Sequence, residues 1–219
     1  NFVYLARNGA RSDLSEVVAT DGARTLLFMP LAHVFARFIE VLCVTEAGIL
    51  GHTPSAANLV ADLQSFKPTF LLAVPRVFEK VYNSASQKAP GGVKKKIFAF
   101  ATRAAISYSK ALATPAGPSA VQKAQLGLAH KLVLHKLVTA MGGQLKYAVS
   151  GGAPLGERLG HFYRGMGVTV LEGYGMTETT ASTTVTRPDD PMERLLTTNG
   201  RMRDVGAAGV SGPHGKLVF

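Results

Sequence analysis

The sequence contains a single cysteine, Cys43, among its 219 residues. A lone cysteine excludes an internal disulfide framework and a cysteine-based zinc site, and it fits a reducing cytoplasm. No apolar run reaches the roughly 18 residues that a membrane-spanning helix needs, because basic residues such as Arg24 and Arg37 interrupt each candidate. Only 17% of the residues are charged and 47% are hydrophobic, which excludes a disordered chain. We therefore expect a globular, cytoplasmic protein without a membrane span.

Acidic residues are absent between Lys80 and Gly156, where 11 lysine and arginine residues lie. The net charge of the whole chain is +10, so this region carries all of the excess. It would attract an anionic partner such as a membrane surface, a nucleic acid, a phosphorylated cofactor or an acidic carrier protein. A solvated helical face is the alternative. We expect no nucleic acid, and we interpret the region from Lys80 to Lys146 as a surface for an anionic membrane, which makes the protein peripheral to the membrane.

Short apolar runs alternate with helical patterns along much of the chain. Residues 25–29 and 69–74 have the length and composition of buried strands, and Pro75 suits the first turn of a helix. This alternation is typical of an α/β fold with mostly parallel sheets covered by helices. Helices are predicted over residues 34–49, 56–65 with Ser55 as N-cap, and 75–84, and further strands over residues 145–149 and 168–171.

Residues 88–141 follow a different pattern. Two long helices are predicted, at about residues 93–112 and 119–141, with a turn rich in proline and glycine between them. In the second helix, apolar residues recur every three or four positions while Lys123 and Lys131 belong to a polar stripe. We interpret this region as a basic helical insertion rather than as part of the sheet.

Two glycine-rich turns follow predicted strands, which is where an open α/β sheet binds its ligands. In the first turn, Gly151 and Gly152 precede Ala153. Glycines at these positions leave room for a flat ligand or an acyl chain to approach the backbone.

The second turn combines three kinds of side chain. Gly173 and Gly175 bracket Tyr174, and Thr177 and Glu178 follow within one turn. A ring can stack on a base, a hydroxyl can bind a phosphate and a carboxylate can hold Mg²⁺. The pattern indicates a nucleotide site, with an ordinary strand-to-helix turn capped by threonine as the alternative.

Ser150 introduces a competing hypothesis. The segment from Ala148 to Gly152 differs at one position from the nucleophile elbow of hydrolases, and His161 and His214 follow as candidate bases. An α/β hydrolase with Ser150 as nucleophile is therefore one alternative function. A non-catalytic anion-binding module, based on the acid-free region alone, is another.

Three stretches carry a family resemblance: residues 29–37, residues 72–82, and residues 150–155 followed by Glu-Gly-Tyr-Gly-Met-Thr-Glu-Thr at 172–179. They resemble the AMP-forming acyl-CoA synthetase (adenylating enzyme) superfamily, and within it the bacterial long-chain fatty-acid-CoA ligases. The similarity covers about residues 1–195. It implies that residues 1–219 are part of the large N-terminal domain of such an enzyme, a partial AMP-binding domain with a loosely matching tail over residues 197–219.

The resemblance also implies a reaction and a set of roles. The reaction is ATP-dependent activation of a long-chain fatty acid to acyl-adenylate and then to acyl-CoA, with Mg²⁺ as cofactor and coenzyme A as co-substrate. Family segments for the phosphate loop, the ribose and the adenylating lysine would fall outside residues 1–219, so we expect the isolated chain to be inactive. The implied roles are adenine stacking for Tyr174 between Gly173 and Gly175, α-phosphate contact for Thr177, Mg²⁺ binding for Glu178, lining of the adenine and acyl pocket for Gly151, Gly152 and Ala153, and proximity to the reacting carboxylate for His33.

Overall fold

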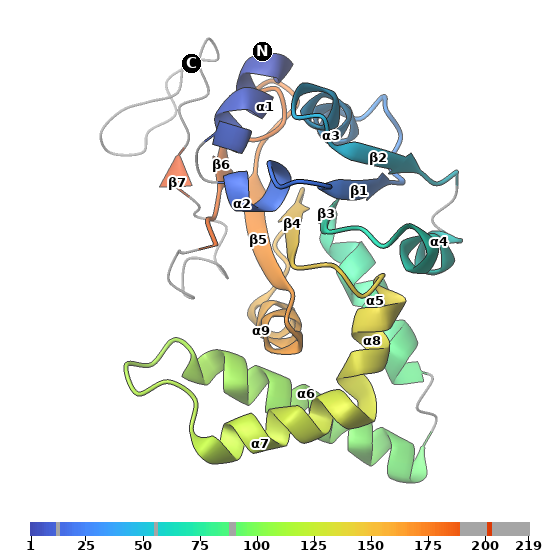
Figure 1. The fold of residues 1–219 in the computed structure, drawn as a ribbon, viewed down its shortest axis with the longest axis vertical. Coiled ribbons are helices and arrows are strands. Elements are labelled where there is room, and N and C mark those ends of the chain that lie inside the picture. Colours follow the sequence, from blue (N-terminus) through green and yellow to red (C-terminus); the bar gives the residue numbers. More distant parts are fainter. Residues whose placement is uncertain (12–13, 55–56, 88–90, 189–200, 203–219) are drawn as a thin grey trace.

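The chain is described by a computed structural model, which covers residues 1–219 apart from 12–13, 55–56, 88–90, 189–200 and 203–219. Within the described residues the fold is α/β, with two sheets flanked by helices, as the sequence predicts (Figure 1). The predicted tail at 197–219 lies outside the described residues except for Arg201 and Met202. None of the helices in the described ranges is long and apolar enough to cross a membrane.

The larger sheet has the strand order β3-β4-β5-β6-β7. Its first three strands are parallel, and β6 and β7 are antiparallel to their neighbours. All four residues of β3 are buried, as expected for a parallel strand covered on both faces. The strands are β3 (Phe70–Ala73), β4 (Tyr147–Gly151), β5 (Thr169–Tyr174), β6 (Thr184–Val185) and β7 (Arg201–Met202).

A second, two-stranded sheet lies beside the first. Its strands β1 (Arg24–Leu27) and β2 (Ile49–His52) are parallel. The backbone N–H of Thr69 donates to the carbonyl of Arg24 at 2.9 Å, and this hydrogen bond joins β1 to the start of β3. The two sheets are therefore placed edge to edge.

Alternate side chains of β3 enter two separate hydrophobic cores. Phe70 and Leu72 pack with the first three helices, whereas Leu71 and Ala73 point to the opposite face and pack with the later ones. The sheet therefore has helices on both faces. The first set is α1 (Phe2–Arg11), α2 (Ser15–Val18) and α3 (Val34–Thr45), and the second is α4 (Leu59–Phe66), α5 (Pro75–Gln87), α6 (Gly92–Ala111), α8 (His135–Ala140) and α9 (Glu157–Met166).

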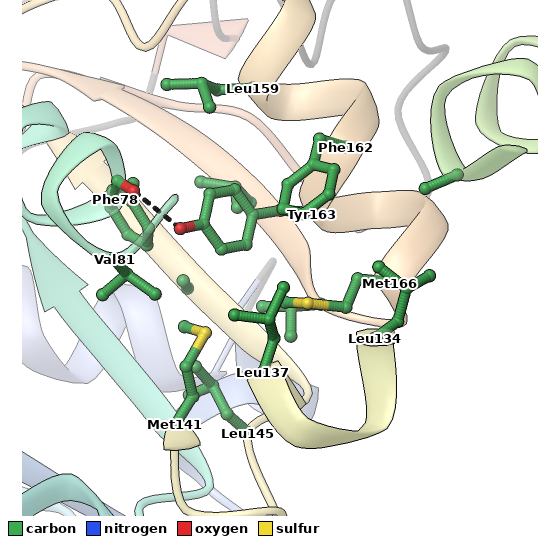
Figure 2. Close-up of a cluster of buried hydrophobic side chains, with 14 of the residues drawn as sticks. Phe78, Val81, Leu134, Leu137, Met141, Leu145, Leu159, Phe162, Tyr163 and Met166 are labelled. Atoms are coloured by element: carbon green, nitrogen blue, oxygen red, sulfur yellow. Dashed lines mark hydrogen bonds between the residues drawn. The ribbon is translucent and has the colours of Figure 1, made fainter. Parts of the chain in front are cut away.

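Several aromatic rings pack against one another in the second core (Figure 2). The ring centroids of Phe78 and Tyr163 lie 5.4 Å apart in an edge-to-face arrangement, and the Tyr163 hydroxyl donates a 2.7 Å hydrogen bond to the Phe78 carbonyl. Tyr163 is fully buried, so this bond satisfies a polar atom that would otherwise be costly to bury. The contact fixes α9 against α5. Helix α5 follows β3, and α9 lies between β4 and β5, the two strands that end at the site described below.

The predicted helix over residues 34–49 was wrong at its C-terminal end. Helix α3 ends at Thr45, Ala47 has a left-handed φ of 52°, and Ile49 begins β2 instead. The N–H of Ile49 donates to the carbonyl of Ala23 at 2.8 Å, so pairing with the chain before β1 decides the conformation here. The apolar character of residues 34–49 could not reveal this, because it suits either element.

Two other helix predictions need correction in detail. Helix α4 begins at Leu59 with Asn58 in the N-cap position, and the predicted cap Ser55 lies outside the described residues. The predicted helix over residues 119–141 is present but is interrupted by a π-helical turn, η1 (His130–Leu134), between α7 (Ala120–Ala129) and α8. Ser119 caps α7 in a capping box with Gln122.

The described part of residues 88–141 consists of helices joined by the turn at residues 112–119, as predicted. Helix α6 packs on α9 and contributes Phe98, Ala101 and Ala105 to the second core. Helix α7 lies against α6, and the Gln122 amide donates a 3.0 Å hydrogen bond to the Ser107 hydroxyl. In Figure 1 the α6–α7 pair occupies the end of the molecule away from β1 and β2.

Candidate functional site

A cavity of about 620 Å³ opens at the carboxyl ends of β4 and β5. These strands end together, because Gly151 pairs with Gly173 in the parallel register. The two glycine-rich turns are therefore neighbours, as the sequence predicts for an open α/β sheet. The sequence-predicted residues that line the cavity are His33, Gly151, Gly152, Ala153, Gly173, Tyr174, Gly175 and Thr177.

The β4 turn forms one wall of the cavity. Gly151 is buried, and a Cβ placed there would lie 3.5 Å from the Phe35 ring and from the carbonyl oxygen of Gly173. Gly152 has a φ of +86°, a left-handed conformation that favours glycine. The wall is therefore made largely of backbone.

The β5 turn forms the facing wall. The Tyr174 side chain is 44% exposed, so its ring is accessible from the cavity. Gly175 has no room for a side chain, because its Cβ would collide with the carbonyl oxygen of Ala181. The Thr179 hydroxyl closes the turn by accepting a 3.0 Å hydrogen bond from the Met176 N–H. Only glycine at 175 lets the chain fold back this closely.

Glu178 is exposed on the same turn but does not line the cavity. It is adjacent to Thr177, whose side chain is also exposed. Within the described ranges, no group of three or more histidine, cysteine or acidic residues gathers to hold a metal. Mg²⁺ is commonly bound through one carboxylate together with water and substrate phosphates, and Glu178 fits that donor set.

His33 is the N-cap of α3. Its Nδ1 accepts a 3.2 Å hydrogen bond from the Phe35 N–H, and the side chain is exposed at the cavity. Because Nδ1 is occupied as an acceptor, the neutral ring carries its proton on Nε2. His33 is therefore both a structural cap and a polar group of the site.

The apolar part of the cavity lies between the sheet and α1 to α3, and sequence reasoning missed most of it. In α3, Phe35, Phe38 and Leu42 recur at helical spacing, a signal that could have identified this face. The other apolar lining residues come from separate segments, so no local pattern marks them. They include Leu5, Leu14, Val18, Leu72, Val149 and Val185.

Two charged residues at the start of α5, Arg76 and Glu79, also line the cavity. Both are exposed. Their position follows from Pro75, which begins the helix directly after β3 and so directs its first turn toward the carboxyl edge of the sheet. Sequence reasoning placed the helix but not these two side chains.

Ser150 and Glu172 lie behind the cavity wall and are paired in the register of β4 and β5. Ser150 is 1% exposed and does not line the cavity. The candidate base His161 is hydrogen-bonded instead to Ser109, with 3.0 Å between Nδ1 and the hydroxyl oxygen. His214 lies outside the described residues. A serine this deeply buried is not an accessible nucleophile, and among the described residues no histidine base is hydrogen-bonded to it, so the geometry does not support the hydrolase hypothesis.

Comparison with known protein families decides between the remaining alternatives. The family model described as AMP-binding enzyme matches residues 1–216. The chain belongs to this family. Neither a hydrolase nor a non-catalytic anion-binding module receives support from the comparisons.

Curated relatives of this family member include several named long-chain ligases. It is 46% identical over 169 residues to the long-chain-fatty-acid–CoA ligase FadD15 of Mycobacterium bovis, an alignment that covers 77% of this chain and 28% of FadD15. It is 36% identical to long chain acyl-CoA synthetase 3 of Arabidopsis thaliana, over 75% of this chain and 24% of that protein. The chain thus spans less than a third of the length of these relatives.

Solved structures of adenylating enzymes share the fold. The N-terminal domain of FACL13 from Mycobacterium tuberculosis matches with a TM-score of 0.56 and 18% identity, over 92% of this chain and 38% of that one. The o-succinylbenzoate CoA synthetase MenE of Bacillus subtilis matches with a TM-score of 0.55 and 15% identity, over 91% of this chain and 31% of that one. These matches confirm the prediction of an N-terminal domain fold of adenylating enzymes.

Proposed function

We propose that the full-length protein activates a long-chain fatty acid with ATP, forming acyl-adenylate and then acyl-CoA. The observation that carries this proposal is one cavity with two kinds of lining. The Tyr174 and Thr177 turn supplies a ring and a hydroxyl, and helices α1 to α3 supply an apolar surface. The names of the relatives support the substrate class.

The reaction has two balanced steps. In the first, a carboxylate oxygen of the fatty acid attacks the α-phosphorus of ATP, the bond to the β-phosphate breaks, and pyrophosphate leaves. In the second, the thiol of coenzyme A attacks the acyl carbonyl, AMP leaves, and the thiol proton passes to solvent. Fixed positive charge and hydrogen-bond donors at the phosphates stabilise the transition states of both steps.

The proposed roles are those that the family resemblance implies, and the positions of the residues support them. Tyr174 offers a partly exposed ring for adenine, and Gly151, Gly152 and Ala153 form a wall that is mostly backbone. Thr177 offers a hydroxyl for the α-phosphate.

Glu178 and His33 take the remaining roles. Glu178 holds Mg²⁺, which supplies charge neutralisation at the phosphates when bound. We assign to His33 the donation of a hydrogen bond from Nε2 to the fatty carboxylate, since Nδ1 is used as the cap of α3.

Fatty-acid-dependent exchange of labelled pyrophosphate into ATP tests the proposed function in the full-length protein. We expect exchange with long-chain fatty acids and acyl-CoA formation once coenzyme A is added. Tyr174→Ala should raise the KM for ATP, because a stacked ring contributes about 1–3 kcal/mol to base binding. Absence of exchange with all fatty acids tested would contradict the proposal.

We propose, in addition, that α7 and η1 dock on an anionic lipid bilayer. Val121, Leu128 and Leu132 are 65%, 50% and 40% exposed, and spacings of seven and four residues place them along one side of the helix. Lys131 of η1 and Lys136 at the start of α8 are exposed and adjoin these residues in the sequence. Apolar and basic side chains on one helix are typical of interfacial membrane binding, and the acid-free sequence around them supports an anionic partner.

Vesicle co-sedimentation of the full-length protein tests this docking surface. Binding to vesicles with anionic lipid should exceed binding to neutral vesicles and should fall as salt is added, because charges are screened beyond about 8 Å at physiological ionic strength. The double variant Leu128→Ser, Leu132→Ser should bind anionic vesicles more weakly than the wild type does. Equal binding to both vesicle types, or none, would contradict the proposal.

A further inference from the structure

Glu172 lies in the middle of β5, and its side chain points away from the cavity. It is 3% exposed and is paired in register with Ser150 of the parallel strand β4. Paired positions on parallel strands place their side chains on the same face of a sheet. That face carries Ala148 and Val170, which belong to the second core. Glu172 is therefore a buried acidic residue on the face of the sheet that packs into the second core, behind the cavity wall.

In the described part of the chain, the carboxyl group of Glu172 makes one hydrogen bond, which reaches the facing wall of the cavity. Its Oε1 accepts from the backbone N–H of Leu155 at 3.0 Å. Leu155 ends the segment 152–155, whose first three residues line the cavity. We call this segment the 152–155 turn. The hydrogen bond thus connects the turn that follows β4 to the strand that carries Tyr174.

The backbone of Glu172 adds a second connection. Its N–H donates to the Thr186 hydroxyl at 2.8 Å, and its carbonyl accepts from the Thr186 N–H at 2.9 Å. Thr186 is fully buried. Glu172 therefore connects three segments: the turn after β4, the strand β5 and the chain that follows β6. The first two of these segments carry the two walls of the cavity.

Among the residues that the structure describes, two polar atoms beside this connection have no hydrogen-bond partner: Oε2 of Glu172 and Oγ of Ser150. Burial raises the pKa of the Glu172 carboxyl, and the Leu155 N–H opposes that rise. Buried polar atoms without partners are costly and are uncommon in ordinary cores. The free-energy cost of burying this carboxyl group indicates that the glutamate has a specific role. The side chain is long enough to accept the hydrogen bond from the Leu155 N–H.

We propose that Glu172 is a positioning residue of the adenylating site, which holds the 152–155 turn at a fixed distance from the turn of Tyr174. This inference rests on the proposed function. Glu172 does not contact the cavity itself, so it acts through the two walls. Displacing a binding wall by about 1 Å is enough to cost on the order of 100-fold in efficiency.

Two conservative variants separate the length of the side chain from its charge. Glu172→Gln keeps an oxygen at the same reach, so the Leu155 N–H retains its acceptor. Glu172→Asp keeps the acid but shortens the side chain by one methylene, which withdraws the acceptor. In full-length protein we expect the glutamine variant to match the wild type within about twofold. We expect the aspartate variant to raise the KM for ATP by about tenfold or more.

Ser109→Ala is the matched control, because Ser109 is also buried and polar but lies in α6, away from the cavity. A general loss of packing would lower the active fraction and therefore kcat, without moving the KM for ATP. If wild-type protein shows no fatty-acid-dependent exchange, the proposed function is wrong and this inference falls with it. If the wild type is active and the aspartate variant has a normal KM for ATP, or the glutamine variant shows the larger defect, the positioning role is wrong and the proposed function stands.

Discussion

The hydroxyl of Ser109 lies 3.0 Å from Nδ1 of His161, at the point where α6 packs on α9. Both side chains are buried. On the other side of the ring, Nε2 lies 3.6 Å from a carboxylate oxygen of Glu157, which is itself 2.8 Å from the Lys110 ammonium group. Burial, followed by the charge of Lys110, lowers the pKa of His161. This histidine is a neutral structural link at neutral pH.

The lowered pKa of His161 predicts that stability falls in mild acid. Between the lowered pKa of the folded state and the ordinary value of about 6.5, the unfolded chain binds a proton that the folded chain does not. The free energy of unfolding should therefore decrease as the pH falls through that window. His161→Gln should reduce this decrease, measured by urea unfolding at about pH 7.5 and about pH 5.5. His135→Gln, at an exposed position, is the control and should leave the decrease intact.

Gly165→Ala should destabilise the fold by about 1–3 kcal/mol or more. A Cβ at Gly165 in α9 would collide with the carbonyl oxygen of Ala105 in α6, and backbone cannot move aside as a flexible side chain can. Gly127→Ala in α7 is the matched control, because nothing lies within 4 Å of its added Cβ. It should stabilise the helix by up to about 1 kcal/mol. Equal melting temperatures for the two variants would refute the close helix crossing.

Cys43 should react slowly with thiol reagents. Burial raises the pKa of the Cys43 thiol to about 11, so only a small fraction is thiolate near neutral pH. We expect alkylation of the folded protein at about pH 8 to be on the order of 100-fold slower than in denaturant. The reaction can be followed by the mass of the modified protein. Rapid labelling without denaturant would mean that α3 exposes this residue.

Glu178→Gln in the full-length protein should impair adenylate formation. An amide can still coordinate Mg²⁺ but no longer balances its charge, so pyrophosphate exchange should fall and need more Mg²⁺. Thr177→Ala should act on the same step. Glu46→Gln, at the C-terminal end of α3 and outside the cavity lining, is the control. Near-normal exchange at low Mg²⁺ in the Glu178 variant would remove this residue from the proposed site.

Local chemistry determined much of the fold and a large part of the candidate site. Pro75 begins α5 as predicted, because its fixed φ and missing N–H suit the first turn of a helix. The fully apolar sequence of β3 predicts a strand buried on both faces, and all four of its residues are buried. The two glycine-rich turns lie together at one edge, because parallel strands end at the same side of a sheet. These features depend on short stretches of chain.

Other features required the tertiary structure. Residues 49–52 form β2 rather than the end of a helix, because the N–H of Ile49 finds a partner on a distant segment. A Cβ at Gly51 would lie 2.6 Å from the ring of Phe66, 15 residues later in the chain. The absence of a side chain at Gly51 therefore makes room for a ring from another element. Helix α1 was also not predicted. The apolar part of the cavity was not predicted because its residues come from separate elements.

Ser150 and Glu172 show the difference most clearly. The sequence determined that a small polar residue follows an apolar strand and that an acid precedes Tyr174, and it left Ser150 open as a nucleophile. The tertiary structure decided that both side chains are buried on the far side of the sheet, where Glu172 accepts a hydrogen bond from Leu155. Side-chain direction alternates along a strand, and what covers each face is set by helices distant in sequence. Burial and hydrogen-bond partners therefore belong to the fold as a whole.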